Sequence, residues 1–228
     1  MGSVISVNLA VPRPDPANGG ALTGIDKRPT TVAVAVRAPA EKGSGGLRGD
    51  QIYDVAGHGG PDQAVYAFAQ EDLDEWAHTL DRTLSPGMFG ENLTTSGVDV
   101  TGALVGERWR IGGEVVLEVT RPRIPCKTFA AWMGYPDWVK RFTRRAAPGA
   151  YLRVITPGEV RAGDPLVVTD RPDHDVTIGL VFRALTLEPE LLPRLLAAEA
   201  LAEEVRERVT RRLSGSPVTR SIGATESS

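Results

Sequence analysis

The chain has 228 residues, and its 26 basic and 29 acidic side chains give a formal charge of −3. This near-balance argues against bulk attraction to nucleic acid or to an anionic membrane. No apolar run approaches the roughly 20 residues that cross a bilayer, and the opening residues lack the basic and apolar segments of a secretory signal. The single cysteine cannot form an internal disulfide. We therefore predict a cytoplasmic protein with neither nucleic-acid nor membrane partners.

Short β-rich runs, punctuated by glycine and proline, dominate the first three quarters of the chain. Many short strands of this kind are typical of a β-sandwich or β-barrel and not of a doubly wound sheet. Gly112–Gly113 separates two of the runs and predicts a two-residue hairpin. The predicted strands are Val4–Leu9, Thr31–Arg37, Arg108–Ile111, Glu114–Thr120, Tyr151–Ile155 and Leu166–Thr169.

Two amphipathic segments interrupt the strands and predict helices. Gln70–Leu80 places its apolar residues on one face and begins with carboxylates, which favour a helix start. Pro136–Arg145 has proline in the first turn, where a missing N–H is tolerated. Its residues Trp138, Val139 and Phe142 are expected to pack on one side.

The composition changes after about Asp170. Three apolar-periodic segments follow a polar connector and predict three short helices, although the β-branched content of the first is also compatible with a strand. In the third, Val205, Val209 and Leu213 share a face. We predict a main domain over residues 1–170, a three-helix domain over 171–214 and a disordered tail over 215–228. The three segments are Val176–Leu185, Pro189–Ala198 and Leu201–Leu213.

The most informative segment for chemistry surrounds Cys126, directly after a predicted strand. The following residues are compatible with a short helix, so the cysteine would lie near a helix N-terminus, close to Arg121, Arg123 and Lys127. Both features favour the thiolate over the thiol. A thiolate is a nucleophile, a redox group or a soft ligand for a metal such as molybdenum. The alternative is that Cys126 is a small buried hydrophobic residue.

A second segment, Gly57–Gln63, surrounds a histidine with glycines. Backbone N–H groups in such a bend can approach an anion. His58 and Asp62 could orient a ligand or each other, with Gly59 and Gly60 between them. The alternative is a structural turn before the following helix.

Two further segments carry polar groups in glycine-containing loops. Glu91 and Asn92 offer hydrogen bonds suited to a heterocycle, or they belong to an edge-strand turn. Lys27 and Arg28 are adjacent cations that could bind a phosphate. Adjacent basic residues in a loop are also explained by simple solvation.

The order and combination of these segments resemble the MOSC domain family, and most of all its stand-alone bacterial YiiM-like members with a C-terminal three-helix domain. The resemblance extends from the first strand to about Asp170. The segments that carry it are Thr23–Pro29, Gly57–Gln63, Gly87–Leu93, Thr94–Gly97, Gly106–Arg110 and Arg121–Cys126.

The resemblance implies a mainly β fold with some α, a barrel related to that of pyruvate kinase. It places Cys126 at the position of the family's cysteine, the sulfur carrier or the ligand of molybdenum in a molybdopterin-type cofactor. It assigns Lys27 and Arg28 to the phosphate end of that cofactor, and Asn92, Arg121 and Arg123 to the pterin and oxo groups. The remaining cofactor-binding residues that it suggests are His58, Gly59, Gly60, Asp62 and Glu91.

The resemblance also implies a function, the reduction of N-hydroxylated compounds such as N-hydroxylated bases. Electrons would come from an electron-donor protein, because the chain has neither a ferredoxin-type cysteine set nor a dinucleotide-binding glycine motif. Pyridoxal phosphate is attached to the same superfamily, but the sequence offers no lysine in a clear Schiff-base context. Two alternatives stay open: a sulfur carrier that holds a persulfide on Cys126, and a non-catalytic anion-binding protein. The C-terminal helices are expected to serve docking, homodimer formation or the covering of a barrel edge.

Overall fold

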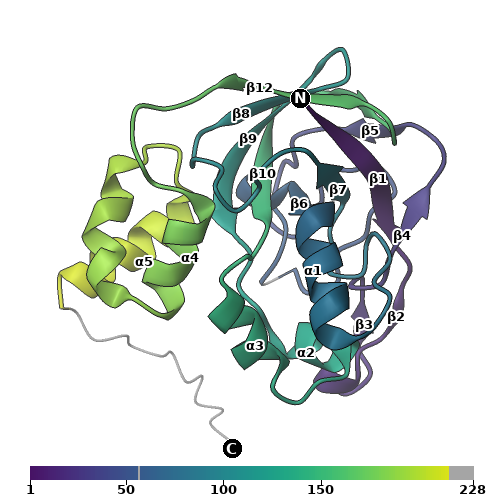
Figure 1. Cartoon of the computed structure of the whole chain (residues 1–228), viewed down its shortest axis with the longest axis horizontal. Coiled ribbons are helices and arrows are strands. Elements are labelled where there is room, and N and C mark those ends of the chain that lie inside the picture. Colours follow the sequence, from purple (N-terminus) through teal and green to yellow (C-terminus); the bar gives the residue numbers. More distant parts are fainter. Residues whose placement is uncertain (56, 216–228) are drawn as a thin grey trace, which may run out of the picture.

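The computed structural model describes residues 1–55 and 57–215, so residues 216–228 of the predicted disordered tail lie outside the described residues. Within this part, a mixed sheet of eight strands has the order β12-β8-β9-β10-β6-β7-β1-β4. A further pairing of β1 with β12 closes seven strands into a barrel and leaves β4 paired to β1 (Figure 1). The mainly β, barrel-like fold predicted from the sequence is confirmed. These strands are β1 (Gly2–Ala10), β4 (Lys27–Thr30), β6 (Val65–Ala69), β7 (Leu93–Ser96), β8 (Arg108–Ile111), β9 (Val115–Pro122), β10 (Ala150–Thr156) and β12 (Pro165–Asp170).

Two small sheets and eight helical segments complete the described chain. The small sheets pair β2 (Arg13–Pro14) with β3 (Leu22–Thr23), and β5 (Val34–Val36) with β11 (Gly158–Val160). Across residues 1–55 and 57–215, none of the helices has the length and apolar character needed to cross a bilayer. The helices are α1 (Gln70–Leu80), α2 (Lys127–Met133), α3 (Trp138–Arg145), α4 (Ile178–Thr186) and α5 (Glu203–Leu213), with 3₁₀ segments η1 (Pro16–Asn18), η2 (Pro61–Gln63) and η3 (Pro189–Ala197).

Helix α1 connects the parallel strands β6 and β7. Parallel neighbours cannot be joined by a tight turn, so a crossover helix is the expected connection. The predicted helix Gln70–Leu80 is confirmed residue for residue, and its apolar face buries Leu73 and Trp76. This crossover places Asn92, just before β7, beside Tyr66 of β6, where the two residues exchange hydrogen bonds.

The hairpin between β8 and β9 differs from the prediction. Ile111 pairs with Val115, so the loop has three residues, Gly112–Glu114, and not two. Gly112 takes a positive φ of 60°, a conformation that costs glycine little because it has no Cβ.

Several strands were missed or trimmed relative to the sequence prediction. The predicted strand Thr31–Arg37 contracts to β5, and β4 and β7 were not predicted at all. Strand β4 has the sequence Lys-Arg-Pro-Thr, whose charges and proline conceal it; proline is tolerated there because β4 pairs along one side only. Strand β6 is continuously buried, so it lacks the alternation that would have revealed it.

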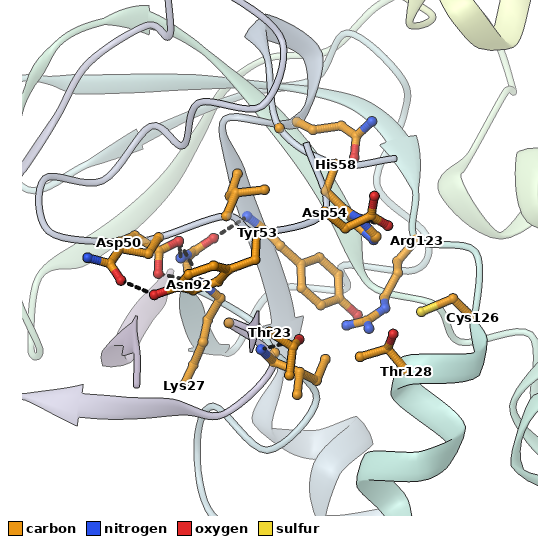
Figure 2. A pocket seen from close by; sticks show the side chains of 18 of the residues that line it. Thr23, Lys27, Asp50, Tyr53, Asp54, His58, Asn92, Arg123, Cys126 and Thr128 are labelled. Carbon is orange, nitrogen blue, oxygen red and sulfur yellow. Dashed lines mark hydrogen bonds and ion pairs between the residues drawn. The ribbon is translucent and has the colours of Figure 1, made fainter. Parts of the chain in front are cut away.

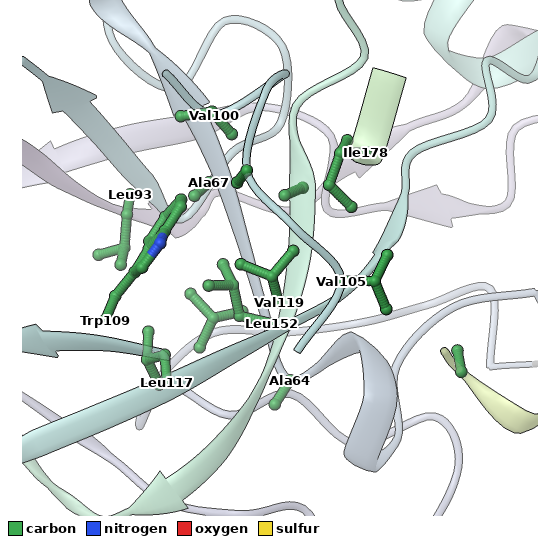
Figure 3. Packing of buried hydrophobic residues seen from close by; sticks show 14 of the residues in the cluster. Ala64, Ala67, Leu93, Val100, Val105, Trp109, Leu117, Val119, Leu152 and Ile178 are labelled. Atoms are coloured by element: carbon green, nitrogen blue, oxygen red, sulfur yellow. The ribbon is translucent and has the colours of Figure 1, made fainter. Parts of the chain in front are cut away.

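Two apolar clusters hold the molecule together. The barrel interior is largely aliphatic, with Trp109, Leu117 and Val119 packed at its centre (Figure 3). The second cluster is aromatic: α1, α2 and α3 enclose rings in edge-to-face and tilted contacts at centroid distances from 4.7 to 6.3 Å. The main rings of this cluster are Tyr66, Phe68, Trp76, Phe89, Phe129, Trp138, Phe142 and Phe182.

The three C-terminal segments are helical and lie together against one side of the barrel (Figure 1). The first is the helix α4 and not a strand, and the middle one is a 3₁₀ helix that contains Pro193. Two residues of the predicted apolar helix faces are exposed, since Leu213 is 44% exposed and Val139 of α3 is 40% exposed. Apolar residues of these helices join the same cluster as the barrel interior, and the domain boundary at residue 170 stays a prediction.

Candidate functional site

A cavity is lined by segments that lie far apart in the sequence. It contains about 780 Å³ of atom-free space, part of it open to solvent. Lysine, arginine, histidine, carboxylate and thiol groups line it together with Tyr66 and Tyr151. Figure 2 shows Lys27, Asp50 and Asn92 on one side of this cavity, and Arg123, Cys126 and Thr128 on the other. Its remaining labelled residues, Thr23, Tyr53, Asp54 and His58, complete the view.

Cys126 reaches the cavity because two elements meet there. Strand β9 ends at Pro122, and α2 begins at Lys127, so Cys126 is the extended residue immediately before the helix (φ −127°, ψ 173°). The short helix predicted to follow the cysteine is confirmed. The side chain is half-buried and lines the cavity, which contradicts the alternative of a sealed core residue. The expected preference for thiolate stays a prediction.

The small hairpin formed by β2 and β3 is tied to α2 beside the cysteine. Thr128 donates to the buried carboxylate of Asp15 at 2.6 Å, and Asn18 donates to the same side chain at 2.5 Å. The Arg13 guanidinium lies 4.8 Å from the ring centroid of Trp132. Burial raises and these hydrogen bonds lower the pKa of Asp15, with a net lowering, so the carboxylate is ionised at neutral pH. The hairpin thus forms one wall of the cavity at the thiol side.

Arg123 provides the buried positive charge of the cavity. Its side chain lies between aromatic rings, with the guanidinium carbon 4.1 Å from the Phe129 centroid and 5.2 Å from that of Tyr66. It donates to the Phe89 carbonyl through Nη1, while its buried Nε has no hydrogen-bond partner within the described residues. Burial alone would lower the pKa of Arg123, but the neighbouring Tyr66, Tyr151 and Cys126 raise it, so the guanidinium stays charged.

Lys27 forms the opposite side of the cavity as an ion pair. Its Nζ lies 2.5 and 2.6 Å from the two carboxylate oxygens of Asp50, and both side chains are almost fully buried. Asp50 also accepts from Asn92 Nδ2 at 2.9 Å and from the Ala10 amide at 2.9 Å. Burial lowers the pKa of Lys27, although Asp50 opposes this shift. These groups make a rigid, hydrogen-bonded end.

His58 lies at the cavity on the glycine-rich loop that the sequence indicated. Its Nδ1 is 3.3 Å from Asp54, and Gly59 beside it also lines the cavity with a positive φ of 79°. Burial and the nearby Arg123 lower the pKa of His58, while Asp54 opposes them. The imidazole is therefore uncharged at neutral pH and can accept or donate a proton.

Half of the ten residues predicted to bind the cofactor line the cavity, and half do not. The residues that the structure brings together there are Lys27, His58, Gly59, Asn92 and Arg123. The residues outside the cavity lining are Arg28, Gly60, Asp62, Glu91 and Arg121.

Glu91, Arg28 and Gly60 have structural partners in place of a ligand. Glu91 is fully buried and accepts hydrogen bonds from the Gly87 and Phe89 amides and the Thr94 hydroxyl, so it holds the loop before β7. Arg28 is exposed and forms an ion pair with Asp26 at 3.0 Å. Gly60 has a positive φ of 93° where a Cβ would lie 3.3 Å from the Lys42 backbone, so its role is conformational.

Asp62 and Arg121 face the C-terminal helices. Asp62 pairs with Arg153 at 2.7 Å and accepts from the Glu203 amide at the start of α5 at 3.2 Å. Arg121 pairs with Glu204 of α5 at 3.1 Å. The structure therefore places both residues at the contact with α5, outside the cavity lining, and their predicted role at the ligand stays a prediction.

The sequence analysis missed several groups that line the cavity, above all Asp50, Asp15, Asp54, Tyr66 and Tyr151. Tyr66 donates to the Pro148 carbonyl at 2.8 Å, and its ring lies 5.0 Å from that of Tyr151. Burial raises the pKa of both phenols, so they stay neutral donors and aromatic walls. None of these residues stands in a recognisable motif; only the folded chain, which brings them to the cavity, identifies them.

The residues present fit a cofactor that brings most of its own metal ligands. No group of three or more His, Cys, Asp or Glu that could hold a bare metal ion occurs across residues 1–55 and 57–215. Cys126 can supply one soft ligand. The unpartnered buried Nε of Arg123 and the remaining N–H of Lys27 suit the oxygen and ring nitrogen atoms of a molybdopterin-type group.

Comparison with known proteins points to one family. The model of the MOSC domain matches residues 54–167. A Bacillus subtilis protein named YflK is 32% identical over 208 residues, covering 90% of this chain and 91% of the relative. YiiM of Escherichia coli is 31% identical over 180 residues, covering 75% of this chain and 78% of that protein.

Two further matches extend the comparison to structure and to a named activity. The crystal structure of YiiM from Geobacillus stearothermophilus superposes with a TM-score of 0.75 at 26% identity, covering 93% of this chain and all of that one. A Gibberella moniliformis protein named "Reductase" is 30% identical over 135 residues. The match covers 56% of this chain but only 23% of that longer protein.

Proposed function

The chain belongs to the MOSC domain family, and from this premise we propose that it binds a molybdopterin-type molybdenum cofactor and reduces N-hydroxylated compounds. The observation that carries the proposal is the half-buried thiol of Cys126, which lines the same cavity as the buried, charged Arg123. A relative named as a reductase supports redox chemistry on this fold.

The proposal assigns separate tasks to the cavity residues. Cys126 would ligate the metal through its sulfur, and Arg123 would donate to oxygen atoms beside it. Lys27 would donate its remaining N–H at the other end, where Asp50 holds the ammonium and Asn92 in turn donates to Asp50. The adjacent, tilted rings of Tyr66 and Tyr151 would restrict how flat molecules enter.

The reaction consumes protons as well as electrons: R–NH–OH + 2 H⁺ + 2 e⁻ gives R–NH₂ + H₂O. The bound cofactor would supply the two-electron chemistry, and an electron-donor protein would restore the electrons. His58, uncharged at neutral pH and in contact with Asp54, can pass a proton toward the leaving hydroxyl. A small-molecule substrate and an electron-donor protein are therefore the proposed partners.

Metal content tests the proposal most simply. Protein produced in a host that makes molybdopterin should contain molybdenum near one atom per chain, and Cys126→Ser should lose it while Arg28→Gln, altered outside the cavity, keeps it. The unsubstituted protein should also reduce an N-hydroxylated base with a chemical electron donor. Equal activity in protein free of molybdenum would contradict the mechanism.

A sulfur carrier is the second candidate, favoured by the isolation of the thiol. Cys126 is the single cysteine of the chain, and among the described residues its sulfur accepts or donates no hydrogen bond. An accessible thiol beside a buried cation suits a persulfide, which is more acidic than a thiol. Mass spectrometry after incubation with a cysteine desulfurase and cysteine would show a gain of one sulfur on the unsubstituted protein and none on Cys126→Ser.

A further inference from the structure

The two buried cations of the cavity differ in how their charge is compensated. The ammonium of Lys27 contacts both oxygens of Asp50, and the pair is almost completely buried. Asp50 in turn receives four hydrogen bonds, two from Lys27 and one each from Asn92 and the Ala10 amide. The carboxylate has therefore filled its acceptor capacity, and this end of the cavity carries no net charge.

Arg123 has no such counter-charge. Within the described residues no carboxylate oxygen lies in ion-pairing distance of its guanidinium, which is only 4% exposed. Its charge is balanced by aromatic faces and a carbonyl, and its Nε is buried without a hydrogen-bond partner. A buried charge without a partner is unfavourable, and an incoming anion would relieve that cost.

The other ionisable groups near Arg123 do not supply the missing negative charge. Tyr66 and Tyr151 are neutral phenols, and His58 is a neutral imidazole at neutral pH. The carboxylates that line the cavity are engaged elsewhere, since Asp54 pairs with His58 and Asp15 accepts from Thr128 and Asn18, and neither forms an ion pair with Arg123. The Cys126 thiol, the candidate metal ligand, also acts on the charge of Arg123. An oxygen atom that carried negative charge next to that sulfur would meet the free donor of Arg123.

We propose that the two ends of the cavity bind ligand groups of different charge: an oxyanion binds beside Arg123 and Cys126, whereas the neutral Lys27–Asp50 pair binds an uncharged edge that offers a hydrogen-bond acceptor to Lys27. This inference deepens the proposed function, because it states which end of the same cavity takes negative charge. It also reverses the sequence-based expectation that Lys27 and Arg28 form the phosphate end, since both cations already have carboxylate partners.

Anion titration of metal-free protein tests the charge assignment without requiring cofactor or activity. Inorganic phosphate and molybdate, each titrated by calorimetry at fixed ionic strength, distinguish the two sources of oxyanion. Arg123→Gln should weaken binding about tenfold or more, the loss expected for one charge-assisted hydrogen bond. The matched control Arg121→Gln removes the same charge two residues away, outside the cavity lining, and should leave binding unchanged.

Two further variants make the test independent of whether Arg123→Gln folds well. Lys27→Gln/Asp50→Asn keeps the opposite end of the cavity neutral and should bind oxyanions like the unsubstituted protein. If Arg123→Lys retains oxyanion binding, the positive charge at position 123 is what binds the anion.

The assignment would be overturned if the double variant lost binding while Arg123→Gln kept it, or if the unsubstituted protein bound neither anion saturably. These outcomes concern inorganic anions on metal-free protein. They leave the molybdenum proposal standing, and failure to incorporate molybdenum would leave the charge assignment standing.

Discussion

Two regions flank the end of strand β9, the cavity and the interface with the C-terminal helices, and they use similar residues differently. Arg123 turns toward the cavity, where it lies between aromatic rings without an ion pair. Arg121, two positions earlier, reaches α5 and pairs with Glu204. Residues two apart in a regular strand share a face, but β9 ends at Pro122, and its pairing with β10 shifts register opposite Tyr151.

Arginine therefore stabilises the interface with the C-terminal helices, whereas in the cavity it is available to bind a ligand. At the helix interface Asp62 and Arg121 have charged partners, so both act as structural connectors. In the cavity, Arg123 and Cys126 lack such partners and are available to a ligand. Four substitutions test whether the two regions differ in this way.

Phe129→Ala should cause the largest loss, because the ring lies under the guanidinium of Arg123 and contacts Phe89 and Trp138 within about 5.3 Å. Removing a fully buried phenylalanine typically costs about 3–5 kcal/mol of unfolding free energy. Urea denaturation measures this loss, with Val139→Ala on the exposed side of α3 as the control. A loss as small as that of the control would contradict the packing described here.

Asp62→Asn should cost about 1–2 kcal/mol, since it removes the ion pair with Arg153 and weakens an acceptor at the start of α5. The same denaturation experiment measures it. Because Asp62 lies outside the cavity lining, the substitution should leave the affinity for inorganic oxyanions unchanged. A loss of affinity like that expected for Arg123→Gln would place Asp62 in the binding machinery after all.

Arg121→Gln should change the unfolding free energy by about 0–1 kcal/mol, because its partner Glu204 is largely exposed and such ion pairs contribute little. The effect should shrink further in high salt, which screens exposed charges. A large, salt-independent loss would show that the contact between β9 and α5 depends on this pair.

The effect of His58 on the stability of the fold should be small and confined to mildly acidic pH. Burial and Arg123 lower its pKa in the folded protein, so the fold resists protonation and loses stability as the pH falls below the ordinary imidazole value of about 6.5. His58→Gln removes this contribution and should flatten the decline of melting temperature between neutral pH and mild acid. An unchanged decline would show that other groups cause it.

The periodicity of apolar residues was sufficient to predict the helices and strands that pack along their whole length with one face on a single layer. Helix α1 and strand β8 match the prediction at both ends, because one face of each packs on a single layer. Strand β6 was missed because both of its faces are buried, and β4 because its residues are polar and it pairs along one side only. Neither property leaves a period in the sequence.

The sequence predicted those site residues whose position depends on their sequence neighbours. It did not predict those whose position depends on contacts with residues far away in the sequence. Cys126 before a short helix, and His58 within glycines, follow from neighbouring residues alone. Asp50 becomes part of the cavity only when Lys27 and Asn92 converge on it from distant segments. Similarly, nothing local to Arg121 indicates that α5 will cover it.

The proposed function requires that the sulfur of Cys126 binds molybdenum in a cavity whose charge comes from Arg123. X-ray absorption at the molybdenum edge of protein isolated with bound metal measures the sulfur atoms around the metal directly. We expect one more sulfur neighbour around molybdenum in the unsubstituted protein than around any molybdenum retained by Cys126→Ser. An identical set of sulfur neighbours in the two proteins would show that Cys126 does not bind the metal.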